Sequence, residues 1–306
     1  MACTSALNLL PSDCCRDCHS FLESPRHMAS TMKVLVTGAS GLVGRAVTEQ
    51  LLALGGYEVL AMTRTSPARP VPGARYMPVG DMTLNTDWQS ALTNVQTVVH
   101  AAARVHVLND HTARSLARFE RVNVEVALKL ARQAALAGVR RFVFLSSIGV
   151  NGVRTEVDSA FSETDQPQPH NPYAHSKLKA ELGLRQIAGE TGLEVVIIRP
   201  PLVYGPGVRA NFAALMRAVQ RGWPLPLGAV HNFRSMVGID NLVDLIITCL
   251  KHPKAANQTF LVSDGHDLSS AELVRGLARE AGWAHDCCRC RRGFCGPVPP
   301  WWGEGT

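Results

Sequence analysis

Long apolar runs and blocks of like charge are both missing from this 306-residue sequence. No apolar stretch approaches the ~20 residues that a membrane-spanning helix needs, so we expect no contact with a membrane. The net charge of +6 is scattered along the chain, which favours small anionic molecules over nucleic acid as partners. The N-terminal segment has neither the apolar core of a secretory signal nor the strong charge of a transit peptide, so we expect a cytoplasmic protein.

Cysteine is almost missing from the body of the chain, because eight of the nine cysteines lie near its two ends and only Cys249 lies between them. This distribution argues against a disulfide scaffold, and the terminal clusters lack the paired spacing of a zinc site, so we expect no functional metal. Cys249 lies in an apolar run and is expected to be buried. We predict a disordered extension at 1–31 and an atypical Cys/Trp-rich tail at 283–306.

The sequence does contain an alternation of short apolar runs and helical patterns over its first two-thirds. Such βα units predict an α/β fold with a doubly wound parallel sheet of the Rossmann type, whose ligands bind at the carboxyl ends of the strands. With 46% apolar residues, the chain can bury a large core. The expected strands are 33–37, 58–62, 97–101, 142–146 and 194–199, and the expected helices are 45–54, 119–137, 173–191, 212–221 and 272–281.

A glycine-rich turn joins the first expected strand to the first expected helix. Gly38, Gly41 and Gly44 follow the spacing Gly-x-x-Gly-x-x-Gly directly after the strand. The first glycine permits a tight turn, the second lets the backbone approach a pyrophosphate, and the third lets helix and strand pack closely. The helix N-terminus offers N–H groups and a partial positive charge to the phosphates. The strand–turn–helix context favours a dinucleotide site over a glycine turn without a ligand.

A serine, a tyrosine and a lysine predict proton transfer beside that cofactor. Tyr173 and Lys177 lie four residues apart in an expected helix and share a face, while Ser147 follows the expected strand 142–146. A nearby ammonium favours the phenolate, so we expect Lys177 to lower the pKa of Tyr173. We predict that Ser147 binds the substrate oxygen, that Tyr173 transfers the hydroxyl proton and that Lys177 binds the nicotinamide ribose. The alternative is an exposed Tyr–Lys pair on a helix surface.

These motifs together resemble those of the extended short-chain dehydrogenases/reductases, and specifically the NAD-dependent epimerase/dehydratase family with its UDP-glucose 4-epimerase-like members. The resemblance runs from about Met32 to about Gly282 and also rests on the segments 100–103, 199–207 and 239–244. It implies a cofactor domain at 32–200 and a smaller substrate lobe at 201–282, which we expect to be truncated because the tail departs from the family pattern. It further implies a nucleotide-sugar substrate and a homodimer.

The resemblance also implies roles for single residues. Ser147, Tyr173 and Lys177 match the catalytic residues. The positions that match the cofactor site are Gly38, Ser40, Gly41, Leu42 and Val43 at the pyrophosphate, Asp81 and Met82 at the adenine, Ala101, Ala102 and Ala103 along the nicotinamide side, and Asn123, Tyr173, Lys177 and Pro200 around the reacting end.

The substrate would be anchored by its diphosphate while the sugar turns. Ser147 is one candidate contact, and Asn211 and Arg234 are candidates for the anchor. Asn211 precedes an expected helix, near a terminus that favours anions, and Arg234 could bind a phosphate through its guanidinium. An ordinary helix cap and an ordinary surface arginine are the competing interpretations.

One position departs from the pattern of an NAD enzyme. An acidic residue usually follows the glycine motif by about 20 residues and binds the ribose 2′-hydroxyl, whereas an arginine accommodates the 2′-phosphate of NADP. Here Arg64 takes that place and no acidic residue lies near it. Three hypotheses follow: an NAD-dependent UDP-hexose 4-epimerase that oxidises the sugar transiently at C4, an NADP(H)-dependent reductase of nucleotide 4-keto sugars, and a cofactor-binding protein without turnover because of its altered C-terminus. The first agrees best with the motifs as a set.

Overall fold

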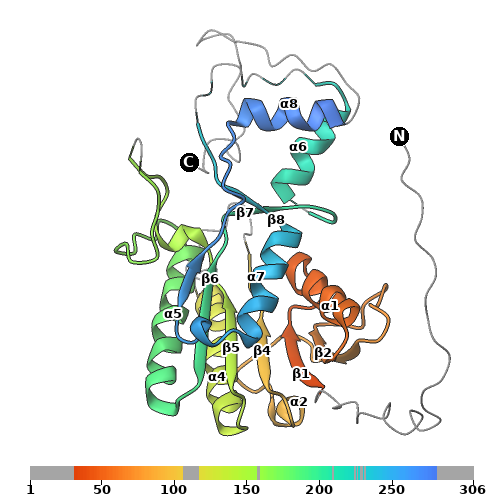
Figure 1. Cartoon of the computed structure of the whole chain (residues 1–306), viewed down its shortest axis with the longest axis vertical. Coiled ribbons are helices and arrows are strands. Elements are labelled where there is room, and N and C mark those ends of the chain that lie inside the picture. The colour runs from red at the N-terminus through yellow and green to blue at the C-terminus, as the bar shows by residue number, and fades with distance from the viewer. Residues whose placement is uncertain are drawn as a thin grey trace, which may run out of the picture. The chain divides into compact units, whose positions relative to one another are not determined.

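Seven parallel strands form the central sheet of the protein (Figure 1). They lie in the order β3-β2-β1-β4-β5-β6-β9, and all the neighbouring pairs are parallel. The strand order reverses between β1 and β4, which is where a Rossmann sheet opens a ligand crevice. The strands are β1 (Met32–Thr37), β2 (Tyr57–Thr63), β3 (Arg75–Pro78), β4 (Thr97–His100), β5 (Arg141–Leu145), β6 (Glu194–Arg199) and β9 (Thr259–Leu261).

The structure is a computed structural model and describes residues 31–280 except 106–116, 157–158, 209, 224, 226, 228–229 and 231. The predicted tail at 283–306, and all but the last residue of the predicted extension at 1–31, lie outside the described residues.

Helices cover both faces of the sheet. The helices α1 and α7 pack on one face, and α2, α4 and α5 pack on the other. Across the described ranges, every helix is too short or too polar to span a bilayer. The helices of these layers are α1 (Leu42–Leu54), α2 (Gln89–Leu92), α4 (Val126–Leu136), α5 (Pro172–Thr191) and α7 (Ile239–Lys251).

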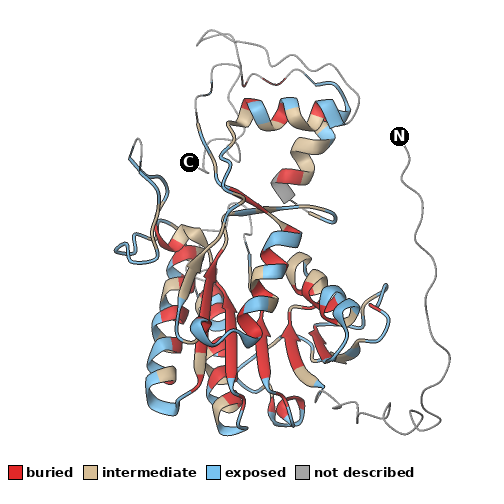
Figure 2. Cartoon of the chain, viewed as in Figure 1, coloured by how far each residue is buried: buried red, intermediate tan, exposed pale blue. Residues whose placement is uncertain are grey.

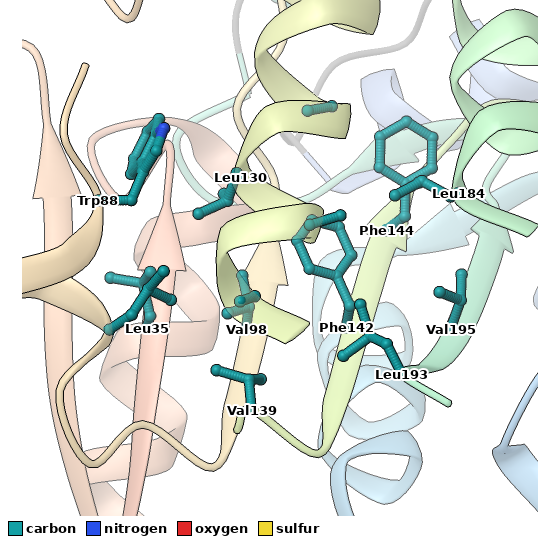
Figure 3. Packing of buried hydrophobic residues seen from close by; sticks show 14 of the residues in the cluster. Leu35, Trp88, Val98, Leu130, Val139, Phe142, Phe144, Leu184, Leu193 and Val195 are labelled. Carbon is teal, nitrogen blue, oxygen red and sulfur yellow. The ribbon is translucent and has the colours of Figure 1, made fainter. Parts of the chain in front are cut away.

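The side chains of the strands alternate between two apolar layers. On β5, Phe142 and Phe144 point towards α4 and α5, where they pack with Leu130 and Leu184 (Figure 3), while Val143 belongs to the layer beneath α1 and α7. The central strands are buried on both faces (Figure 2), which is why they appear in the sequence as continuous apolar runs rather than as alternating ones.

A smaller group of elements lies beyond the carboxyl ends of the strands (Figure 1). It contains a two-stranded parallel pair, β7 (Leu202–Tyr204) with β8 (Met236–Gly238), and two helices, α6 (Ala210–Gln220) and α8 (Ser270–Glu280). These helices share an apolar cluster of their own, made of Val219, Leu225, Leu227, Ala271, Val274 and Ala278. Although they follow residue 200, α7 and β9 return to the large sheet, and the division into a cofactor domain and a substrate lobe stays a prediction.

The predicted doubly wound parallel sheet is confirmed by this topology. The five strands and the helices expected from the sequence are present, with ends shifted by a few residues at most. The helix expected over 119–137 contains the π-helical segment η2 (Glu120–Glu125), which α-helical residues precede and follow. Cys249 is buried, as expected.

Candidate active site

The glycine turn lies where β1 ends, pressed against the segment that follows β4. Gly38 has φ +69°, and a Cβ added there would lie only 2.7 Å from the backbone nitrogen of Ala102. Only glycine permits both this conformation and this approach. The turn and Ala101–Ala103 are therefore neighbours across the point where the strand order reverses.

The first turn of α1 is open to an anion. Gly41 precedes the helix, and none of the side chains that the structure describes caps its N-terminus. Gly44 allows the helix to approach the turn, because a Cβ there would lie 2.4 Å from the carbonyl oxygen of Gly38. Ser40 is exposed, and Leu42 and Val43 are half-buried. Uncapped N–H groups at a glycine-lined helix start are the cradle that a pyrophosphate needs, so these residues fit a dinucleotide.

His100, the last residue of β4, ties this turn to the sheet. Its Nδ1 lies 2.9 Å from Oγ1 of Thr37, the last residue of β1, and Thr37 Oγ1 also accepts from the N–H of Ala102 at 3.4 Å. Burial, and then the charge of Lys177, lowers the pKa of His100 to about 3, so the imidazole is neutral. Its Nε2 is buried and has no hydrogen-bond partner among the described residues.

Helix α5 places Tyr173 and Lys177 beyond the end of β5. Asn171 caps the helix, since its Oδ1 accepts from the N–H of Ala174 at 2.8 Å, and Pro172 occupies a position in the first turn. The ammonium of Lys177 donates to the carbonyl of Leu145 at 2.6 Å. This bond holds the lysine, which is 2% exposed, against the last residue of β5. An ammonium has three N–H donors, so further donors can reach a ribose hydroxyl.

Burial dominates the titration of this pair. It raises the pKa of Tyr173 to about 12 and lowers the pKa of Lys177 to about 7, with the carboxylate of Glu181 opposing the second shift. From the sequence, the ammonium of Lys177 was expected to lower the pKa of the Tyr173 phenol, and the direction is the opposite in this structure. The reason is that Lys177 Nζ lies 5.8 Å from the centroid of the Tyr173 ring, while both groups have lost their hydration.

Ser147 starts a short turn that packs beside the start of α5. It caps the 3₁₀ segment η3 (Ile148–Val150), and its Oγ accepts from the N–H of Gly149 at 3.2 Å. The N–H of Ile148 donates to the carbonyl of Pro200, just after β6, at 3.0 Å. A Cβ at Gly149 would lie 3.5 Å from the Cβ of Ala174. The structure therefore brings Ser147, Pro200 and the first turn of α5 to one edge of the sheet.

Asn123 joins three segments of the site. It lies in the π-helical segment η2 and is buried. Its Oδ1 accepts from the N–H of Arg104 at 2.8 Å, while its Nδ2 donates to the carbonyl of Arg104 at 3.2 Å and to Oγ of Ser176 at 2.9 Å. Ser176 Oγ donates in turn to the carbonyl of Tyr173 at 2.7 Å. A π-helical turn is frequent at functional sites, and here it connects the segment after Ala103 to α5.

The candidates at the adenosine end lie on the outer strands. Arg64 directly follows β2 and is exposed, and its carbonyl accepts from the N–H of Gly80 at 3.0 Å. Asp81, also exposed, and Met82, half-buried against the core, follow Gly80. Arg64 and the Asp81–Met82 pair are therefore neighbours at the same edge of the sheet as the glycine turn.

The two anchor candidates belong to the smaller lobe. Asn211 lies in the first turn of α6, and its side chain lies outside the described part of the structure. Arg234 forms an isolated antiparallel bridge with Leu268. Its Nε is buried and has no hydrogen-bond partner among the described residues, and burial lowers its pKa. A buried guanidinium nitrogen without an acceptor is well suited to bind an anion.

Several residues for which the sequence predicted no individual role support these groups. They are Thr37 and His100 at the ends of β1 and β4, and Ser146, Asn151, Ser176, Glu181 and Arg199 around the start of α5. The spacing of Lys177 and Glu181, one helical turn apart, is a signal that could have indicated Glu181. Among the described residues, no group of three or more His, Cys, Asp or Glu side chains could hold a metal ion.

Comparison with known proteins gives consistent matches. Residues 34–263 match the model of the NAD dependent epimerase/dehydratase family. A protein of Vibrio cholerae named UDP-glucose 4-epimerase is 48% identical over 246 residues, which cover 80% of this chain and 74% of the relative.

Two solved structures extend the likeness to the fold. One is MoeE5 in complex with UDP-glucose and NAD, which is 30% identical with a TM-score of 0.71 and 83% of each chain covered. The other is UDP-glucose 4-epimerase from Thermotoga maritima with UDP-glucose, which is 25% identical with a TM-score of 0.73 and 86% and 87% of the two chains covered.

Proposed function

Because the chain belongs to the NAD-dependent epimerase/dehydratase family, we propose that it interconverts UDP-hexoses that differ in configuration at C4. The cofactor is NAD, and the chain is a sugar-nucleotide epimerase/oxidoreductase. The observation that carries the proposal is the pair of half-buried Tyr173 and buried Lys177 on α5, at the carboxyl edge of the same sheet whose β1 ends in the glycine turn. That edge supplies both an anion cradle and a proton-transfer group.

The residues present fit this cofactor. The uncapped first turn of α1 and Gly38 to Val43 would hold the pyrophosphate, and Arg64, Asp81 and Met82 would face the adenosine. Ala101 to Ala103, Asn123 and Pro200 would line the nicotinamide side, and Lys177 would donate to its ribose. When bound, NAD accepts a hydride from the sugar and returns it.

The residues of the chain handle the proton. With a pKa near 12, Tyr173 holds its proton at neutral pH and can donate it to a ketone oxygen. Donation of this proton leaves a phenolate that a protonated Lys177 would stabilise, and in the reverse step the phenolate accepts the proton of the C4 hydroxyl. Ser147 would hydrogen-bond the same sugar oxygen, because its turn packs beside the start of α5. We assign Ser147, Tyr173 and Lys177 as the catalytic residues on this basis.

The substrate diphosphate would be held by the smaller lobe. Arg234 offers a buried Nε without an acceptor among the described residues, and Asn211 lies in the first turn of α6, where helix N–H groups attract anions. Anchoring the diphosphate while leaving the hexose without fixed contacts would let the keto sugar turn and present its other face. We also propose that the chain forms a homodimer, as the resemblance implies.

The proposal is tested with the purified full-length chain. Mass spectrometry of the nucleotide released on denaturation should identify NAD, and UDP-glucose and UDP-galactose should each be converted into an equilibrium mixture without net change in absorbance at 340 nm. Bound NAD without conversion of any nucleotide sugar would overturn the proposal and support cofactor binding without turnover.

A second candidate function rests on Arg64. It stands at the end of β2, where an NAD enzyme usually has an acidic residue, and it is exposed and able to meet a 2′-phosphate. This favours an NADP(H)-dependent reductase of nucleotide 4-keto sugars. Stoichiometric consumption of NADPH with a keto sugar would select this function over epimerisation.

A further inference from the structure

A buried ion pair joins α5 to the end of β6, behind the assigned catalytic residues. Glu181 is 1% exposed and Arg199 is 3% exposed. Oε1 of Glu181 accepts from Nε of Arg199 at 3.0 Å, and Oε2 accepts from its Nη2 at 2.6 Å. This two-pronged arrangement fixes both the distance and the relative orientation of the two side chains, and therefore of the two elements that carry them.

The same pair holds both ends of the turn that carries Ser147. Before the turn, the hydroxyl of Ser146 donates to Oε1 of Glu181. After it, Oδ1 of Asn151 accepts from Nη1 of Arg199 at 2.9 Å. Ser146 and Asn151 are only 4% and 2% exposed, so water does not compete for these bonds. Ser147 thus lies between two residues that are bound to one ion pair.

On α5, Glu181 shares a face with Tyr173 and Lys177. Glu181 follows Lys177 by one helical turn and Tyr173 by two, and residues at this spacing lie on the same side of a helix. Lys177 is itself bound to the carbonyl of Leu145, next to Ser146. Glu181 therefore fixes the distance between the turn that carries Ser147 and the face of α5 that carries Tyr173 and Lys177.

We propose that Glu181 and Arg199 act as positioning residues, a clamp that fixes Ser147 against the helix that carries Tyr173 and Lys177. The kinetic consequence of this clamp rests on the proposed function. Replacing a buried ion pair with apolar side chains of similar size is often neutral for stability, so stability alone does not account for the Glu181–Arg199 ion pair. Apolar side chains could not form the directional hydrogen bonds that orient the Ser146 hydroxyl and the Asn151 amide. The reaction needs this orientation because it places Ser147, between them, relative to Tyr173.

The clamp is tested with Glu181→Gln and a matched control, Glu194→Gln. Oε2 of Glu194 accepts from Nε of buried Arg141 at 2.8 Å, so this glutamate also forms an ion pair between β5 and β6, but at their amino ends and with a partly exposed carboxylate. In Glu181→Gln we expect the amides of Ile148, Val150 and Asn151 to exchange with deuterium about tenfold faster or more. We expect kcat to fall about 10- to 100-fold, with KM changed by less than about threefold and bound NAD retained.

In Glu194→Gln the exchange of these amides and kcat should stay within about twofold of the wild type. If Glu181→Gln does not fold, the double variant Glu181→Leu/Arg199→Met takes its place, because it leaves no unpaired charge in the core. Unchanged exchange of the turn, or a kcat equal to that of Glu194→Gln, would overturn the clamp. A wild-type protein without epimerase activity would overturn the proposed function, and the exchange measurement would still decide the clamp.

Discussion

Tyr173 and Lys177 lie one helical turn apart, yet burial moves their pKa values in opposite directions, to about 12 and about 7. The identity and spacing of the two residues could be predicted from the sequence, since a four-residue interval on a helix defines a shared face. The direction of the phenol shift could not, because desolvation depends on residues far along the chain. Phe119, whose ring centroid lies 6.5 Å from that of Tyr173, is one of them.

Replacing Tyr173 with phenylalanine removes the proton donor and retains the ring. Because a general acid–base group contributes about 10²- to 10⁴-fold, we expect kcat to fall by this factor while bound NAD is retained. Steady-state kinetics and mass spectrometry of the released nucleotide measure both quantities. Wild-type kcat in Tyr173→Phe would show that another residue transfers the proton.

Lys177 makes the stability of the protein depend on pH in a predictable direction. Its pKa of about 7 in the fold lies below the ~10.4 of an unfolded chain, so the unfolded state binds more protons between these values. The free energy of unfolding contributed by Lys177 therefore rises with pH across this window. Urea unfolding at about pH 7.5 and about pH 9.5 should show a smaller rise for Lys177→Met than for the wild type. Equal rises would mean that Lys177 is not desolvated.

Arg64 should decide how well the chain tolerates a 2′-phosphate. In Arg64→Asp, we expect the affinity for NADP to fall by about tenfold or more, because an aspartate repels the phosphate and binds the ribose hydroxyls instead. Affinity for NAD should not decrease. Isothermal titration of both nucleotides with the cofactor-stripped protein measures this, and an unchanged NADP affinity would place the 2′-position away from Arg64.

Among the secondary-structure elements, the glycine turn is the clearest case of agreement between sequence and structure. The strand, turn and helix are adjacent in the chain, so their spacing alone indicates their arrangement. The structure adds the second surface, the backbone of Ala101 and Ala102, against which Gly38 packs. The π-helical segment that carries Asn123 was not expected. The bonds of Asn123 to Arg104 and Ser176 join residues that are distant along the chain, so no local pattern indicates them.

Gly38→Ala tests this packing against Gly56→Ala. Both glycines have positive φ, +69° and +73°, but a Cβ at Gly56 meets nothing within 4 Å. Backbone strain alone should cost about 1 kcal/mol in Gly56→Ala, and the clash with Ala102 should raise the cost in Gly38→Ala to about 2–4 kcal/mol. Denaturant unfolding gives both values. Gly38→Ala should also lose bound NAD, and equal costs with NAD retained in both would contradict the close approach.

At the scale of the whole molecule, the apolar layers of the sheet are separate from the cluster between α6 and α8, so we expect the two parts to support different ligands. The elements that would hold NAD rest on the sheet, while Arg234 and Asn211 belong to the part that α6 and α8 support. A small cavity created in one cluster should therefore weaken the binding of one ligand, NAD or the nucleotide sugar, more than the binding of the other.

Val274→Ala and Val47→Ala open gaps of the same kind in the two parts. Both valines are fully buried: Val274 lies on α8 in the cluster shared with α6, and Val47 lies on α1 in the layer that packs on the sheet. Each should cost about 1–3 kcal/mol. We expect Val274→Ala to raise KM for the nucleotide sugar with NAD retained, and Val47→Ala to lower NAD affinity. Loss of NAD in Val274→Ala, measured by mass spectrometry, would show that the two parts do not act separately.

The sequence by itself determined the family, the parallel sheet, the cofactor turn and the identity of the assigned catalytic residues, because each depends on short spacings and on continuous apolar runs. Only the tertiary structure decided which distant residues surround them. Glu181 meets Arg199 across 18 residues and Arg199 meets Asn151 across 48. It also decided the pKa directions. The distant contacts and the pKa directions both depend on which side chains the fold buries together, and no local pattern in the sequence encodes such a contact.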